Sequence, residues 1–174
     1  MGKYIALDYQ SDILSIPVPD DFFDVVLCTE VLEHVPYPIE SVRELARILR
    51  PGGKLLLTAP LGCFLHQEPY HFYGGYTPHW YQRFLPAAGL RVGSIDANLG
   101  FFSFFGQEAI RFSALLDPRR VPGGWPWIGC CLVWLLTLPL TRGFFPLLSR
   151  SLDRLGLERT ATVGYHVVAV KVDH

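Results

Sequence analysis

The sequence has 174 residues, half of them hydrophobic, and carries a formal net charge of −1. This length suits one domain with a sizeable core, and the absence of any block of like charge argues against a nucleic-acid-binding protein. Four cysteines without C-x-x-C spacing and the absence of a signal-peptide pattern predict reduced thiols in a cytoplasmic protein.

The first segments of the chain predict a strand, a connector and a second strand. Residues 4–9 (YIALDY) are mostly apolar and contain Asp8 near their end, so we expect a short buried strand there. Residues 13–23 are rich in proline and predict an irregular connector. Residues 24–29 (DVVLCT) are β-branched and apolar with almost no alternation, which is typical of a strand covered on both faces in a parallel sheet.

A helix and a further strand follow. Apolar side chains recur at helical spacing along residues 39–50, at Val42, Leu45, Ala46 and Leu49. Pro51, Gly52 and Gly53 end this helix, and residues 54–60 (KLLLTAP) predict the next buried strand. Strand, helix and strand in this order form a βαβ unit, so the sheet is expected to be parallel here.

The second half predicts one more helix and two more strands. Thr77 and Pro78 suit the first positions of a helix over residues 77–90, and residues 91–97 and 162–172 have the character of strands. The fold class expected is α/β, a Rossmann-like, mostly parallel sheet flanked by helices and incomplete at its N-terminal side. We expect one domain, with residues 1–98 and 160–174 as the sheet core and residues 99–159 as a hydrophobic helical insertion.

Residues 121–141 form a stretch of 21 residues without a charge or a histidine. Prolines and glycines interrupt it, so the usable helix is expected to run only from Trp127 to Leu138, too short to cross a bilayer comfortably. Three alternatives remain open: contact with a membrane surface, internal packing, or a true span. The first would make the protein cytoplasmic but peripheral at a membrane.

Two segments, SIPVPDDFFDVVLCTEVLEHV and ELARILRPGGKLLLTAP, resemble the class I S-adenosylmethionine-dependent methyltransferases, particularly their type 11 group. The resemblance lies in the Pro-Asp-x-x-Phe-Asp lead-in, the Leu-Glu-His-Val motif and the Leu-Arg-Pro-Gly-Gly turn. It implies transfer of a methyl group from S-adenosylmethionine to a small or lipid-linked acceptor. The alternative is a non-catalytic, membrane-associated interaction protein on a methyltransferase-like scaffold.

The resemblance also implies where the cofactor is held, because the site in this family lies at the carboxyl ends of the parallel strands. The expected cofactor-binding residues are Asp8 for the ribose, Asp12 and Ile13 for the adenine, and Thr29, Glu30 and His34 at the mouth of the sheet. The residues alone also allow structural roles: a solvated strand-end acid, two turn residues, an acid at a helix start and a packed histidine.

The segment HQEPYHFY is expected to line the acceptor pocket, through His66, Glu68, Tyr70 and Tyr73, or else to be only loop structure. His71 is the tentative catalytic base. Two histidines and a carboxylate would also suit a metal. The intervening Pro69 and the lack of helical spacing argue against one, so no metal is expected.

The glycine-rich loop of the family has no counterpart in this sequence, since KYIALDYQSD contains no G-x-G. We therefore expect a truncated or degenerate copy with reduced cofactor affinity. An NAD-dependent oxidoreductase shares the sheet type but also needs a glycine fingerprint, and the segment order after Leu-Arg-Pro-Gly-Gly favours the methyltransferases.

Overall fold

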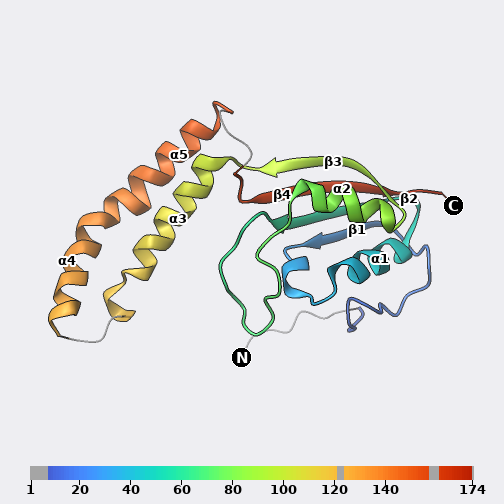
Figure 1. The fold of residues 1–174 in the computed structure, drawn as a ribbon, viewed down its shortest axis with the longest axis horizontal. Coiled ribbons are helices and arrows are strands. Elements are labelled where there is room, and N and C mark those ends of the chain that lie inside the picture. The colour runs from blue at the N-terminus through green and yellow to red at the C-terminus, as the bar shows by residue number, and fades with distance from the viewer. Residues whose placement is uncertain (1–7, 121–123, 157–160, 174) are drawn as a thin grey trace. The chain divides into compact units, whose positions relative to one another are not determined.

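The computed structural model describes residues 8–120, 124–156 and 161–173. The chain divides into two compact units (Figure 1). One, the sheet unit, consists of Met1–Asp96 with Gly164–His174, and the other, the helical unit, consists of Ala97–Val163.

The sheet unit contains a four-stranded sheet in the order β1-β2-β4-β3. Its strands are β1 (Phe23–Thr29), β2 (Leu49–Pro60), β3 (Leu90–Asn98) and β4 (Gly164–Lys171). β1 and β2 are connected by helix α1 (Pro38–Ile48) and pair in parallel, whereas β2 and β4 pair antiparallel. The expected α/β fold and the parallel βαβ unit are confirmed, and the sheet as a whole is mixed.

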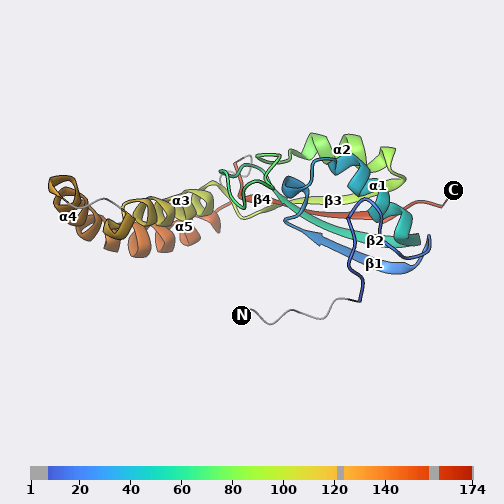
Figure 2. The same ribbon diagram turned by 90° about the horizontal axis from the view of Figure 1, so that it is seen from below.

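Helices α1 and α2 (Pro78–Ala87) lie on the same face of the sheet (Figure 2). α2 begins as expected, because the Thr77 side chain accepts a hydrogen bond from the backbone N–H of Trp80. Between helices and sheet lies the core, whose side chains are almost completely buried: Leu45, Leu55, Leu57, Leu85 and Val167.

The opposite face of β1 is open, and here the sequence-based prediction is wrong. Val25 and Leu27 are 53% and 67% exposed, so β1 is not covered on both faces. The reason is positional: β1 is the end strand of the described sheet, and both helices of this unit pack on the other face. The apolar composition of the strand carried no information about which faces are covered.

The connector before β1 is irregular, as predicted, and two side chains of α1 bind it: Arg47, and Glu44, which accepts from the Ile16 N–H at 2.7 Å. The Arg47 guanidinium donates to the carbonyls of Ile16 and Val18 at 2.9 Å and to the carboxylate of Glu44 at 2.7 and 2.8 Å. Residues 4–7 of the expected first strand lie outside the described residues. Asp8 and Tyr9 are described and are not in a strand.

The helical unit contains α3 (Phe101–Leu115), η2 (Pro118–Arg120), α4 (Trp125–Pro139), η3 (Leu140–Phe144) and α5 (Phe145–Asp153). The expectation of a short helix ending near Leu138 is wrong, because a continuous helix of 27 residues runs from Trp127 to Asp153. A π-helical turn over Leu140–Phe144, closed by the Phe145 N–H donating to the Leu140 carbonyl, carries the helix past Pro139. By length and composition this helix is able to cross a membrane.

Candidate functional site

The carboxyl end of β1 places Thr29 and Glu30 at the edge where the parallel pair ends. Glu30 has a φ of 51°, in the left-handed region that non-glycine residues seldom adopt. Two hydrogen bonds to Thr58 hold it there: the Glu30 N–H donates to the Thr58 carbonyl at 3.0 Å, and the Thr58 hydroxyl donates to the Glu30 carboxylate at 2.8 Å. Such strained backbone often marks functional positions.

A groove of about 540 Å³, which we call the β1 groove, lies between β1 and the connector that precedes it. Its volume is within the ordinary range of small-molecule sites. Two of the expected cofactor residues, Ile13 and Thr29, line it together with aromatic and aliphatic side chains, among them Tyr9, Ile16, Phe23 and Val25. Asp12 and Asp8 are exposed, and the Asp12 carboxylate accepts a hydrogen bond from the Leu14 N–H at 2.9 Å.

Cys28 also lines the β1 groove, but its thiol is unreactive in this environment. Burial, together with the nearby charge of Glu33, raises the pKa of Cys28 to about 12. The thiol therefore remains protonated near neutral pH and contributes apolar surface to the groove.

The loop of residues 61–76 leaves the end of β2 and returns to the start of α2. Its base is closed by the Cys63 N–H donating to the Gly74 carbonyl at 2.7 Å and the Tyr76 N–H donating to the Pro60 carbonyl at 2.8 Å. Gly75 has a φ of 153°, and a Cβ there would overlap the Leu61 carbonyl, so only glycine fits.

This loop packs on the short helix η1 (Leu32–His34). The Tyr76 hydroxyl donates to the Leu32 carbonyl at 2.7 Å, and the Phe72 N–H donates to the Glu33 carbonyl at 2.8 Å. The Tyr73 hydroxyl donates to the carbonyl of Pro36 at 3.1 Å. The loop therefore has one definite placement against η1.

Three imidazole rings meet where the loop contacts η1. The ring centroid of His66 lies 4.8 Å from that of His34 and 4.6 Å from that of His71. His71, the tentative base, has its Nε2 3.3 Å from the Cys63 sulfur. The exposed Glu68 lies outside this group, and Tyr70 joins it only through its backbone carbonyl, which accepts from His34 Nδ1 at 2.6 Å.

Sequence reasoning missed two members of this group, Glu33 and Cys63. Glu33 is only 1% exposed, and its Oε2 has no hydrogen-bond partner within the described part of the chain. Burial raises the pKa of the Glu33 carboxyl above its ordinary value, because the low-dielectric surroundings disfavour the charged form. The Cys-x-x-His spacing of Cys63 and His66 was the available signal for the thiol.

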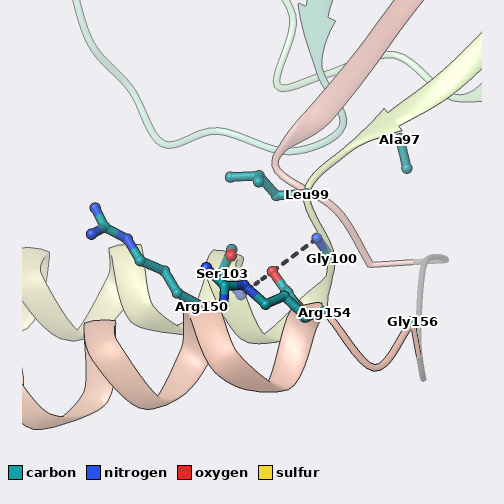
Figure 3. Close-up of a pocket in the computed structure, with 8 residues that line it drawn as sticks. Ala97, Leu99, Gly100, Ser103, Arg150, Arg154 and Gly156 are labelled. Carbon is teal, nitrogen blue, oxygen red and sulfur yellow. Dashed lines mark hydrogen bonds between the residues drawn. The ribbon is translucent and has the colours of Figure 1, made fainter.

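A second cavity, of about 450 Å³, lies in the helical unit between the start of α3 and the end of α5 (Figure 3). The Asp153 carboxylate there accepts hydrogen bonds from the N–H groups of Gly100, Phe102 and Ser103 at 2.9 to 3.1 Å. These bonds cap the N-terminus of α3, so the side chain has a structural function.

Comparison with known proteins shows that the chain is similar to methyltransferases. Residues 3–57 match the family model described as a methyltransferase domain. The 27-O-demethylrifamycin SV methyltransferase of Amycolatopsis mediterranei is 47% identical over 53 residues, which are 30% of this chain and 19% of that protein. An uncharacterized methyltransferase of Mycobacterium bovis is 29% identical over 141 residues, 75% of this chain and 52% of that protein. The chain thus spans about half, or less, of the curated relatives it matches.

Solved structures show the same fold at low identity. The [4+2]-cyclase SpnF matches with a TM-score of 0.54 and 18% identity, over 94% of this chain and 55% of that one. A putative methyltransferase from Bacillus halodurans matches with a TM-score of 0.51 and 15% identity, over 94% of this chain and 71% of that one. The resemblance of residues 3–57 to methyltransferases is confirmed, and the solved structures show the expected fold.

Proposed function

We propose that this chain, whose residues 3–57 match a methyltransferase domain, binds S-adenosylmethionine in the β1 groove and takes part in methyl transfer. The observation that carries the proposal is that Ile13 and Thr29, 16 positions apart, line one groove that runs along β1 and reaches the carboxyl end of the parallel strand pair. Ligands of open α/β sheets bind outside these strand ends. Ile13 offers an apolar contact to adenine. Asp8, Asp12, Glu30 and His34 do not line the groove, so their assignment to the cofactor rests on the resemblance alone.

In the reaction, an acceptor heteroatom attacks the methyl carbon, the sulfur–carbon bond breaks, and its electron pair stays on sulfur to give S-adenosylhomocysteine. The acceptor also gives up a proton where it carries one, and His71 is the candidate base. Most of the acceleration comes from alignment of acceptor, methyl and sulfur. We assign His66, Glu68, Tyr70 and Tyr73, on the loop of residues 61–76, to the acceptor side.

Isothermal calorimetry with S-adenosylhomocysteine tests the cofactor site. Ile13→Asp puts a charge on the groove wall and is expected to weaken binding by about tenfold or more, since each 1.4 kcal/mol is a factor of ten. Leu14→Asp is the matched control, because Leu14 is adjacent and exposed but does not line the groove. No binding at millimolar ligand, or equal losses in both variants, would contradict the assignment.

A second candidate concerns the helical unit, which we propose contacts a lipid surface and thereby favours a lipid-linked acceptor. Only 6% of the most apolar window of the 27-residue helix is buried, and Leu132, Leu136 and Leu147 are 58%, 74% and 64% exposed. Two polar side chains along it bond to α3: Trp134 Nε1 donates to the Ser113 carbonyl at 2.9 Å, and Arg142 Nε donates to the Ser113 hydroxyl at 3.0 Å. An apolar outer face with satisfied polar groups suits an apolar medium.

Co-sedimentation with liposomes tests this second candidate. Wild-type protein is expected to pellet with the vesicles, and a Leu132→Glu, Leu136→Glu variant is expected to stay largely in the supernatant. The exposed Leu65 in the sheet unit provides the control, since Leu65→Glu also removes an exposed leucine but should leave pelleting unchanged. A wild-type protein that stays in the supernatant refutes lipid contact and leaves the cofactor proposal intact.

A further inference from the structure

The proposed methyl transfer does not explain why three histidines gather with a thiol and a buried carboxyl where the loop of residues 61–76 meets η1. We call this group the Cys–His cluster: Glu33, His34, Cys63, His66 and His71. The ligand atoms of Cys63, His66 and His71 all lie within 4.8 Å of one another, and so do those of Glu33, His34 and His66. His66 belongs to both sets, so the two sets adjoin at its ring.

The hydrogen bonds of two rings fix which ring nitrogen keeps its lone pair. Nδ1 of His34 donates to the Tyr70 carbonyl at 2.6 Å, and Nδ1 of His66 donates to the Phe64 carbonyl at 2.8 Å. A carbonyl only accepts, so both Nδ1 atoms carry the proton and, in the neutral rings, both Nε2 atoms keep their lone pairs. Metal-bound histidines almost always show this arrangement, with the second ring nitrogen donating to a carbonyl or carboxylate.

The spacing of the donor atoms suits a transition metal. With metal–sulfur and metal–nitrogen bonds of about 2.3 and 2.0 Å, a tetrahedral zinc site separates sulfur from nitrogen by about 3.5 Å. The Cys63 sulfur and His71 Nε2 are 3.3 Å apart. Thiolate and imidazole donors select zinc and its neighbours in the first transition row over magnesium or calcium.

Glu33 gives an independent reason to expect a cation. Its side chain is buried, its Oε2 has no partner among the described residues, and His34 Nε2 is 3.8 Å from its Oε1. A buried carboxylate is costly unless it is paired or coordinates a metal. A bound cation would stabilise the ionised form of Glu33, and together with the Cys63 thiolate this gives two negative charges, which match a divalent ion.

We propose that Cys63, His66 and His71 bind one Zn²⁺-like divalent ion, with Glu33 and His34 beside it and the fourth coordination position open. While the ion is bound, His71 is a ligand and does not act as the base. Three protein ligands and an open position are the arrangement of zinc sites that bind water or a substrate. The ion would join the loop of residues 61–76 to η1. Because the loop carries the residues assigned to the acceptor, the metal would fix the acceptor side of the molecule.

Cobalt titration of the chelator-treated full chain, without S-adenosylmethionine, tests the site independently of the methyltransferase proposal. One equivalent of Co²⁺ should give a thiolate-to-cobalt charge-transfer band, and Zn²⁺ should displace it. Cys63→Ser should abolish the band, and His66→Gln should weaken Zn²⁺ binding, measured by competition with a chromophoric chelator, by about a hundredfold, more than the typical loss on changing an outer-shell partner. Cys131→Ser and His79→Gln, which change the same residue types elsewhere, should behave as the wild type.

Alkylation of the unaltered protein covers the case in which a variant fails to fold. Zn²⁺ should slow the modification of Cys63 by iodoacetamide, followed by mass spectrometry, and should leave the rate at Cys131 unchanged. The proposal is overturned by the absence of a stoichiometric cobalt band in the wild type, by a band that persists in Cys63→Ser, or by equal alkylation of Cys63 with and without Zn²⁺.

Discussion

Replacing Tyr76 with phenylalanine tests whether a single buried hydroxyl holds the loop of residues 61–76 on η1. Tyr76 is 2% exposed, and its hydroxyl donates to the Leu32 carbonyl at 2.7 Å. Burial raises the pKa of Tyr76, so the hydroxyl stays protonated and donates throughout the neutral range. In the variant the Leu32 carbonyl would keep the long hydrogen bond from the Val35 N–H, at 3.5 Å. We therefore expect the free energy of unfolding to fall by about 1–2 kcal/mol.

Tyr73→Phe is the matched control, because its hydroxyl also donates to a backbone carbonyl, that of Pro36, but at the surface. Water replaces that bond, so the expected cost is about 0.5 kcal/mol or less. Urea unfolding followed by circular dichroism measures both variants, and Tyr76→Phe should also speed hydrogen exchange of the Phe72 N–H, which bonds to Glu33. If Tyr76→Phe costs no more than Tyr73→Phe and leaves this exchange unchanged, the hydroxyl does not anchor the loop.

Three further predictions concern stability. Leu57→Ala, at a position 1% exposed in the central strand β2, should cost about 2–5 kcal/mol in urea unfolding, and a cost below 1 kcal/mol would contradict the described core. Asp153→Ala removes the cap of α3 and should cost about 1–2 kcal/mol, seen as a lower melting temperature; an unchanged melting temperature would mean that the three N–H bonds add nothing. The hydrogen bond from Arg47 lowers the pKa of Glu44 below its ordinary 4.5. The ionised Glu44 therefore contributes to the free energy of unfolding above pH 4.5, and this contribution is lost as the pH falls through the pKa of the folded state. Glu44→Gln should therefore reduce the loss of stability between neutral and acidic pH, and a pH profile equal to that of the wild type would exclude this linkage.

Local patterns predicted the elements of the sheet unit, because each has its own periodicity and end signals. The apolar stripe of α1, the Thr77–Pro78 start of α2 and the valine-rich β4 all lie where these signals placed them, within a few residues. β2 begins five residues earlier than expected, at Leu49, since Gly52 and Gly53 are accommodated inside the strand and not in a separate turn. α1 ends at Ile48, two residues before the expected end, and Leu49 of its expected apolar stripe belongs to β2.

Three tertiary features could not be predicted from the sequence: the open face of β1, the continuous long helix and the Cys–His cluster. Exposure of Leu27 depends on which elements cover β1, and a single strand does not encode its neighbours. Continuation of the long helix past Pro139 depends on a π-helical turn that composition does not reveal. The Cys–His cluster joins Glu33 to Cys63 across 30 residues, and only the packing of a loop on η1 brings them together.

The short segment from Thr29 to His34 connects the two proposed sites. Thr29 lines the β1 groove, whereas Glu33 and His34 belong to the Cys–His cluster. Between them stands Glu30 in its left-handed conformation, held by Thr58 of the neighbouring strand. This chain shares its fold with a [4+2]-cyclase as well as with methyltransferases, so the fold does not determine the reaction. The side chains of this segment must determine it. Because the segment is only six residues long, a change in the position of one site is expected to reach the other through the backbone, and ligands of the two sites would then affect each other's affinity by the same factor.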